Sequence, residues 1–153
     1  MDRFNNIKNK EITDTDGNKH WISPSVSVDA LLVVNGFVLI VKRSSNMSNP
    51  NMWCLPCGFL DWNEDLFTAA IRELYEETGI DVRAFNILNL KDCNRPFALN
   101  GTALQFKFEL FERPDVNLNT EECIDYAWVS TSILKDYDFA FGHNHLIRYI
   151  LEL

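Results

Sequence analysis

Six carboxylates are concentrated in the 23 residues numbered 58–80, where apolar side chains interrupt them at nearly every turn. At helical spacing, three of these acids lie within about 5–6 Å of each other at Cβ: Glu73, Glu76 and Glu77. Like charges this close cost a few tenths of a kcal/mol per pair, so something should offset the repulsion. Clustered carboxylates are hard oxygen ligands of the kind that Mg²⁺ or Mn²⁺ takes, although a solvated acidic surface would also produce such a run.

The helix that carries these acids is expected over residues 64–78. Asn63 can cap its start, and Gly79 can end it in the left-handed conformation. An apolar stripe of Phe67, Ala70, Ile71 and Leu74 would anchor the helix to a core. We therefore expect the three acids to face outward together beside that stripe, with Arg72 available to pair with Glu76.

The flanking sequence predicts a sheet that positions this helix. Two β-rich runs at 26–34 and 37–41 are joined by Asn35-Gly36, a strong hairpin signal because both positions tolerate positive φ. Residues 44–50 have the composition of a loop. Periodicity predicts the remaining elements: strands at 82–90, 104–110 and 124–129, and a helix at 145–153. Strands outnumber helices, which indicates an α+β or mixed α/β sandwich.

Length and composition limit the class of protein. The 153 residues are 46% hydrophobic, enough for one domain with a real core and too few for two. Residues 1–20 are interpreted as a polar N-terminal arm and residues 21–153 as a single domain. Apolar runs are too short to span a membrane, and the first residues are polar, so we expect a cytoplasmic protein without a membrane partner.

The charge balance limits the partners. With 14 basic and 22 acidic residues, the net charge of −8 opposes binding to duplex nucleic acid. It would also repel a small phosphorylated substrate unless bound cations reverse the local sign. Cys54 and Cys57 form a C-x-x-C, but Cys93 and Cys123 make no second close pair, so reduced thiols are expected rather than zinc.

The spacing around the acids resembles the Nudix box at each defining position. The matching positions are Gly58, Glu64, Arg72-Glu73-Leu74, Glu76-Glu77 and Gly79-Ile80. Outside the box, residues 53–58 are similar to the family's W-x-L-P-x-G approach, and Trp128-Val129 to its aromatic strand. The resemblance covers about residues 22–150. It implies the Nudix fold, an α/β/α sandwich with a central mixed β-sheet flanked by helices.

The resemblance also implies a chemistry, the hydrolysis of a nucleoside diphosphate linked to another group. Glu76 and Glu77 would bind divalent metal, Mg²⁺ or Mn²⁺, and Glu73 would be a further ligand or the base that orients water. The residue before the box glycine, commonly a second glycine, is Cys57 here. In the family that position offers a backbone carbonyl to the metal, which a side chain does not prevent.

Other box positions would support the site. Arg72 and Glu64 would join loop and helix by an ion pair, and Gly58 would permit the tight loop against the phosphates. Catalysis also needs water delivered from a defined direction, so a carboxylate outside the box is expected to complete the site. Glu122 is the first candidate and Glu121 the second, although exposed loop acids would look the same.

Substrate contacts are less specific in the sequence. Lys42, Arg43 and Arg95 are candidates for phosphate contacts, with ordinary exposed bases as the alternative. Residues 138–143 could form a specificity segment, in which Phe139 and Phe141 stack a base and Asp138 or His143 reads its edge. Core aromatics would explain the same pattern.

Three functions are compatible with the box. Pro96, 16 residues beyond Ile80 in an expected Asn94-Arg95-Pro96 turn, resembles the ADP-ribose pyrophosphatase subgroup. The alternatives are a triphosphate pyrophosphohydrolase of the sanitising type and a sensor that binds a nucleotide without cleaving it. The intact box disfavours the sensor. Nothing resembles the extra motif of NADH pyrophosphatases, and a homodimer is compatible with each interpretation.

Overall fold

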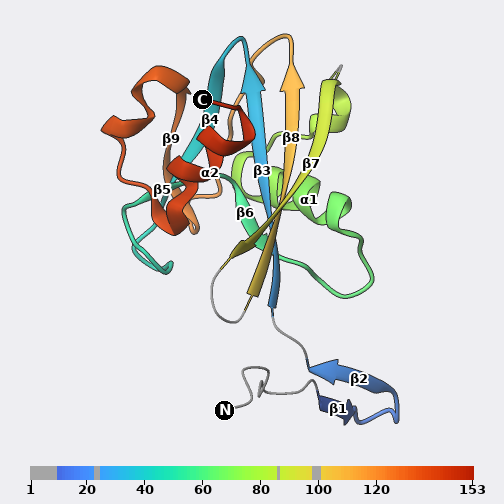
Figure 1. Cartoon of the computed structure of the whole chain (residues 1–153). Helices are drawn as coiled ribbons and strands as arrows, with labels where there is room; N and C mark the ends of the chain where they lie inside the picture. Colours follow the sequence, from blue (N-terminus) through green and yellow to red (C-terminus); the bar gives the residue numbers. More distant parts are fainter. Residues whose placement is uncertain (1–9, 23–24, 86, 98–100) are drawn as a thin grey trace, which may run out of the picture.

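The computed structural model describes residues 10–22, 25–85, 87–97 and 101–153. Its main body is a seven-stranded mixed sheet with helices on both faces, which confirms the expected α/β/α sandwich (Figure 1). Within the described residues, no helix is long and apolar enough to cross a bilayer.

The sheet is built around β3 (Ser25–Val34). An antiparallel hairpin joins β3 to β4 (Phe37–Arg43) through Asn35 at φ 49° and Gly36 at φ 77°, as the sequence predicts. On its other side β3 runs parallel to β8 (Gly101–Leu110) along its whole length. β8 in turn pairs antiparallel with the edge strand β7 (Ile87–Phe97).

The expected strand at 82–90 is wrong in its first half. A 3₁₀ turn, η1 (Val82–Ala84), comes first because the Asp81 side chain accepts the Arg83 N–H and caps it. β7 then continues through Pro96, so the turn expected at residues 94–96 is also wrong. Proline is tolerated there because an edge strand has one side without ladder hydrogen bonds.

Two helical layers cover the two faces of the sheet. Alternate β3 side chains (Val28, Ala30, Leu32) pack in one core cluster with α1 (Leu66–Thr78), and the intervening Leu31 and Val33 pack with the other layer. That second layer is formed by η2 (Thr131–Asp136) and α2 (His143–Ile150). α2 begins two residues before the expected helix and ends three before the chain does. The two-residue period of β3 thus places Asp29 on the α2 face.

The sheet opens between its two central strands. β3 and β4 pair only next to the hairpin turn, at Val33 and Val34. Farther along, β6 (Cys57–Phe59) pairs with β3, whereas β5 (Trp53–Cys54) and β9 (Cys123–Ser130) pair with β4. The two groups of strands therefore separate, and the space between them becomes the cavity described below.

The N-terminal segment contains a small separate sheet. β1 (Lys10–Thr13) and β2 (Lys19–Ile22) form an antiparallel hairpin that Figure 1 shows beside the end of the main sheet. A turn joins the two strands, with Asp14 accepting the Asn18 and Asp16 backbone N–H groups and contacting His20 at 2.7 Å. The described part of the polar arm is thus a hairpin.

Candidate active site

The start of α1 differs from the expectation. Asp65, not Asn63, caps the helix, and its Oδ1 accepts the Thr68 N–H at 2.8 Å. Asn63 has φ 66°, a left-handed conformation that asparagine tolerates. A capping residue instead has an extended backbone, as Asp65 does. Gly79 ends the helix at φ 72°, as predicted, and donates its N–H to the Tyr75 carbonyl.

Arg72 is the centre of an ion-pair network beside the helix. Its guanidinium binds both oxygens of Glu64, at 2.6 and 3.0 Å, and the Glu73 and Glu76 carboxylates at 2.8 and 3.0 Å. It also donates to the Phe59 carbonyl, which lies next to the box glycine. Hydrogen bonding to Arg72 lowers the pKa of Glu64 below its ordinary value. The network fixes the loop against the helix, as the expected Arg72–Glu64 pair requires.

The expectation that all three acids face outward is wrong. Only Glu76 is exposed; Glu73 is 7% exposed and Glu77 is 1% exposed. The segment before β9 covers this side of α1, with Asn117 N–H bonded to the Thr78 carbonyl and Asn119 N–H to the Glu77 carbonyl. A distant part of the chain thus encloses the acids.

Enclosure changes the acidity of the two buried carboxyls. Burial raises the pKa of Glu77 well above its ordinary value, with nearby Cys54, Glu73 and Glu122 adding to the effect. Burial also raises the pKa of Glu73, although Arg72 opposes it. Both groups are therefore costly to keep ionised unless positive charge approaches them.

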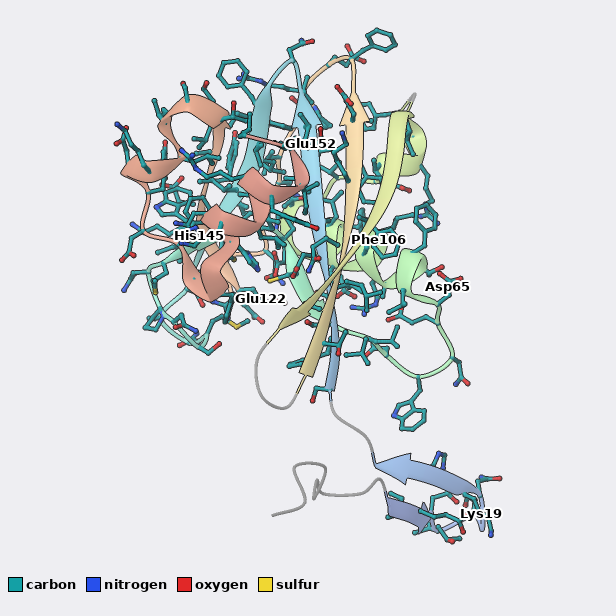
Figure 2. The ribbon with its side chains drawn as sticks, viewed as in Figure 1. Lys19, Asp65, Phe106, Glu122, His145 and Glu152 are labelled. Atoms are coloured by element: carbon teal, nitrogen blue, oxygen red, sulfur yellow. The ribbon has the colours of Figure 1, made fainter. Side chains whose placement is uncertain are left out.

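Glu122 reaches the same place from the opposite side. It lines the cavity, and Asn119 Nδ2 donates to its Oε1 at 3.0 Å, which orients the carboxylate. Glu121 is exposed instead, and its carbonyl accepts the Ser44 hydroxyl. Figure 2 shows Glu122 just before β9, away from Asp65 at the start of α1. Of the two candidates outside the box, the structure brings only Glu122 to the acids.

The arrangement fits a divalent cation on two observations. The Glu77 Oε2 atom is buried and, within the described part of the chain, has no hydrogen-bond partner. Gly58 leaves room for the Glu73 carboxylate, because a Cβ at position 58 would overlap it. An unpartnered carboxylate oxygen among further hard oxygen donors is a suitable site for Mg²⁺ or Mn²⁺.

These acids form one end of a cavity of about 840 Å³, large enough for a nucleotide. Glu73, Glu76 and Glu122 line that end, Asp29, Cys57 and His143 line the floor, and Arg43 and Phe141 line a further wall. Cys57 pairs with Asp29 in the β3–β6 ladder, so the residue before the box glycine lies beside Asp29 on the floor.

The three predicted basic residues have different environments. Arg43 is buried at the cavity, where Ser48 accepts two of its hydrogen bonds and its guanidinium lies 4.8 Å from the Phe141 ring centre. Lys42 points elsewhere, with its Nζ 5.8 Å from the Trp53 ring centre, and does not line the cavity. Arg95 lies in β7, and its side chain falls outside the described residues.

The predicted specificity segment is brought to the cavity only in part. Phe139 packs in the second core cluster and bridges to Trp53, so it is a core aromatic and not a stacking surface. Asp138 is exposed, and its described role is a backbone carbonyl that accepts the Trp53 N–H. Phe141, at φ 58°, and His143 line the cavity. Of the four predicted contacts, the structure thus brings Phe141 and His143 to the cavity, but not Asp138 or Phe139.

Two buried polar residues were not predicted for the site. Asp29 is 3% exposed on the cavity floor, and Gln105, next to it on β8, donates to its Oδ2 at 2.8 Å. The signal was present in the sequence, since Asp29 is the one charged residue in the apolar run 26–34. A buried carboxylate in such a run needs a reason, because burying it unpaired is costly.

A family model described as the NUDIX domain matches residues 23–150. An ADP-ribose pyrophosphatase of Methanocaldococcus jannaschii is 30% identical over 70 residues, which is 46% of this chain and 41% of that protein. The ADPR responsive transcriptional repressor NtrR of Acinetobacter baylyi is 31% identical over 117 residues, 72% of this chain and 45% of the repressor.

Solved structures share the fold. A bifunctional NMN adenylyltransferase/ADP ribose pyrophosphatase of Francisella tularensis, in complex with AMP and manganese, is 29% identical with a TM-score of 0.67. The match covers 84% of this chain and 41% of that one. This chain spans 29–41% of the length of the first curated relatives that it matches.

Proposed function

Because the chain belongs to the Nudix family, on a match that covers residues 23–150, we propose that it is a pyrophosphohydrolase acting on a nucleoside diphosphate linked to another group. ADP-ribose or a nucleoside diphosphate sugar is the proposed substrate, with Mg²⁺ or Mn²⁺ as cofactor. The observation that carries the proposal is a group of four acids from two segments. Glu73, Glu76 and Glu122 line a nucleotide-sized cavity, and Glu77 is buried close to Glu73 and Glu122.

Glu73, Glu76 and Glu77 are the proposed cation ligands, together with the Cys57 backbone carbonyl. Bound divalent cations would neutralise the pyrophosphate and make its phosphorus accessible to water. The unpartnered Glu77 oxygen supports this assignment, because a buried carboxylate without a partner gains most from a cation. With a net charge of −8 on the chain, an anionic substrate needs that reversal of local charge.

Glu122 is proposed to accept the proton of the attacking water. The bond that forms joins the water oxygen to phosphorus, and the bond that breaks is the bridging P–O bond, so the products are a mononucleotide and a second phosphate ester. The hydrogen bond from Asn119 supports this role, since a base must be held in a fixed direction relative to the water. Arg72 binds Glu64, Glu73 and Glu76 and so keeps the helix and the loop in register.

The wall of Arg43 and Phe141 is proposed to contact the nucleotide. The guanidinium adds positive charge without being free to move, because Ser48 holds it. Phe141 offers a ring beside the space that a base would occupy.

The test is a substrate panel with purified protein and magnesium. ADP-ribose, several nucleoside diphosphate sugars and nucleoside triphosphates are incubated separately, and the products are separated by ion-exchange chromatography. We expect AMP and ribose 5-phosphate from ADP-ribose. A parallel preparation of Glu77→Gln controls for contaminating hydrolases and should release neither product.

Two results would overturn the proposal. Cleavage of triphosphates to monophosphate and pyrophosphate, with diphosphate-linked compounds untouched, would indicate a triphosphate pyrophosphohydrolase. Tight binding of ADP-ribose without turnover of any compound would indicate a sensor.

A further inference from the structure

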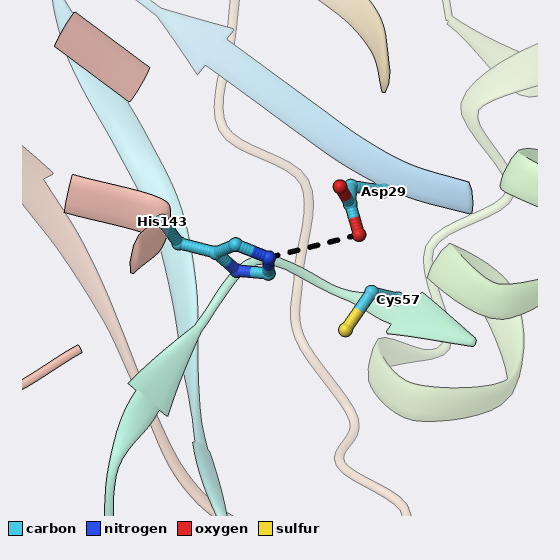
Figure 3. A group of neighbouring side chains, drawn as sticks. All are labelled: Asp29, Cys57 and His143. Atoms are coloured by element: carbon cyan, nitrogen blue, oxygen red, sulfur yellow. Dashed lines mark ion pairs between the residues drawn. The ribbon is translucent and has the colours of Figure 1, made fainter. Parts of the chain in front are cut away.

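The floor of the cavity contains a hydrogen-bond donor and an acceptor that do not satisfy each other. His143, at the start of α2, turns its imidazole toward Asp29 on β3 (Figure 3). The distance from His143 Nε2 to Asp29 Oδ1 is 3.7 Å, which is too long for a hydrogen bond. Both residues are at most 3% exposed and line the cavity.

The tautomer of His143 follows from its other nitrogen. The Leu55 backbone N–H donates to Nδ1 at 3.0 Å, so Nδ1 carries a lone pair and no proton. Burial, with the charge of Arg43, lowers the pKa of His143 to about 3, and the ring is neutral at physiological pH. Its one proton is therefore on Nε2, which makes Nε2–H a fixed donor facing Asp29.

Asp29 is held as the matching acceptor. Gln105 Nε2 donates to Oδ2 at 2.8 Å and fixes the plane of the carboxylate. Among the described residues, neither Asp29 Oδ1 nor His143 Nε2 makes a hydrogen bond, with the 3.7 Å contact their nearest approach. Because both residues line the cavity, these two atoms are open to a ligand that binds there.

A metal ion is the first ligand to consider, because Cys57 Sγ lies within 4.8 Å of both groups. The tautomer argues against it. A metal at Nε2 needs the lone pair there, which would move the proton to Nδ1 and set it against the Leu55 N–H. A ligand that accepts from Nε2–H and donates to Asp29 Oδ1 keeps every existing hydrogen bond.

A nucleobase edge has the required chemistry, an N–H donor beside a ring or carbonyl acceptor in one plane. Phe141 lies next to this point, with ring centres 5.5 Å from His143, and can face a flat ring. Glu73, Glu76 and Glu122 line the same cavity, so one nucleotide could place its base on the floor and its phosphates near the acids.

We propose that Asp29 and His143 read the edge of adenine in the substrate, an inference that rests on the proposed function. The 6-amino group of adenine donates to Asp29 Oδ1, and N1 accepts from His143 Nε2–H. Gln105 and the Leu55 N–H are positioning groups, since they fix the acceptor and the donor without touching the base.

The experiment measures binding of the product AMP, so it does not depend on turnover. Isothermal titration in magnesium compares AMP with purine riboside 5′-monophosphate, which lacks only the 6-amino group, and with 1-deaza-AMP, which lacks the N1 acceptor. Wild-type protein should bind AMP roughly tenfold or more tightly than either analogue, because each leaves one buried polar group unpaired.

Two variants separate reading of the base from support of the fold. Asp29→Ala should lower the affinity for AMP to that for purine riboside 5′-monophosphate, so that the ratio of the two dissociation constants falls to about 1. His143→Asn retains an acceptor for the Leu55 N–H and should remove the preference for AMP over 1-deaza-AMP. Asp136→Asn, exposed in η2, is the matched control and should keep both preferences.

Several outcomes would overturn the inference. If Asp29 and His143 were only structural, both variants would bind AMP and its analogues more weakly by the same factor, and the ratios of their affinities would not change. If the variants fail to fold, equal binding of AMP and purine riboside 5′-monophosphate by wild-type protein is sufficient to reject it. If the protein binds GMP, CMP or UMP more tightly than AMP, and Asp29→Ala removes that preference, then adenine is not the base that this pair recognises.

The same data keep the inference distinct from the proposed function. Hydrolysis of ADP-ribose without discrimination between AMP and its analogues would leave the function standing and the inference refuted. Discrimination between AMP and its analogues without hydrolysis of any diphosphate-linked compound would support the inference and refute the proposed function.

Discussion

Replacing Glu77 with glutamine should abolish activity and yet stabilise the metal-free protein. Glu77 is 1% exposed, and its Oε2 has no hydrogen-bond partner among the described residues. The folded protein must either keep an unpaired buried charge or protonate it, and burial raises the pKa of Glu77 accordingly. Glutamine has a similar shape and no charge, so this cost disappears.

The size of the gain has a ceiling. Protonating a carboxyl of ordinary pKa, about 4.3, costs about 3.7 kcal/mol at pH 7, since one pH unit is worth about 1.4 kcal/mol. The cost of the charge cannot exceed this value, because the group can take up a proton instead. The glutamine amide also needs partners, which offsets part of the gain. We expect a net stabilisation of about 1–2 kcal/mol, or roughly 2–8 °C in Tm for a chain of this length.

The dependence on pH has a definite sign. Because the folded pKa of Glu77 is raised, wild-type stability is fully present below the ordinary pKa near 4.3 and is lost as pH rises through the folded value. The advantage of Glu77→Gln should therefore vanish near pH 4 and be largest at neutral pH. Thermal unfolding in EDTA at several pH values, followed by circular dichroism, measures it.

Glu76→Gln is the matched control for this experiment. The Glu76 side chain is 49% exposed, so its replacement should change the free energy of unfolding by less than about 0.5 kcal/mol at every pH. Magnesium should stabilise wild-type protein more than Glu77→Gln. A Glu77→Gln variant that is no more stable than wild type in EDTA at pH 7 would refute the argument that this charge is buried and unpaired.

Three further changes test the rest of the site. Glu122→Gln should lower kcat about a hundredfold or more with little change in KM, whereas the exposed Glu121→Gln should leave both constants within a factor of two; equal effects would remove Glu122 as the base. Gly58→Ala should cost about 1–3 kcal/mol and most of the activity, because the new Cβ meets the Glu73 carboxylate; unchanged turnover would contradict that contact. Arg72→Lys should lower stability by about 1–2 kcal/mol by chemical denaturation, since lysine cannot bind both Glu64 oxygens; a neutral result would show that the network adds little.

Local sequence rules predicted those features that neighbouring residues decide. Asn35-Gly36 specified the hairpin, and Gly79 specified the end of α1, because positive φ is a property of the residue itself. Asn63 and Asp65 were both acceptable caps by type. The choice between them depended on the backbone conformation of the loop, which the Arg72–Glu64 ion pair holds in place. A rule based on residue type alone contains no information about that conformation.

Burial of the acids could not be read from the helix alone. A helical projection shows which residues share a face, but here the covering segment comes from residues 117–122, about forty positions later in the chain. Similarly, Leu55 and His143 are separated by 88 residues, so no local pattern predicts that His143 faces the cavity. Phe139 and Phe141 are two residues apart, and which one enters the core was decided by the contact of Phe139 with Trp53.

The unsatisfied polar atoms of the molecule are a guide to where it binds. In the described part of the chain, two buried side-chain oxygens lack a partner: Glu77 Oε2 and Gln105 Oε1. The first adjoins the acids at one end of the cavity, and the second belongs to the residue that holds Asp29 at the floor. A core selected for stability alone would replace such groups with apolar ones, since each costs about 1–3 kcal/mol.

Each atom lies beside residues that line the same cavity, the acids Glu73 and Glu122 in one case and Asp29 in the other. Positive charge would satisfy the carboxylates, and a planar donor–acceptor edge would satisfy the pair of Asp29 and His143. Both are met at once by a nucleotide bound with cations, so phosphate chemistry and base selection are expected to be coupled. Occupancy of the floor should therefore raise the affinity of the acids for magnesium, and by the same factor magnesium should tighten the binding of AMP. Titration of AMP at increasing magnesium measures this factor, and a factor of one would show that the two ends act independently.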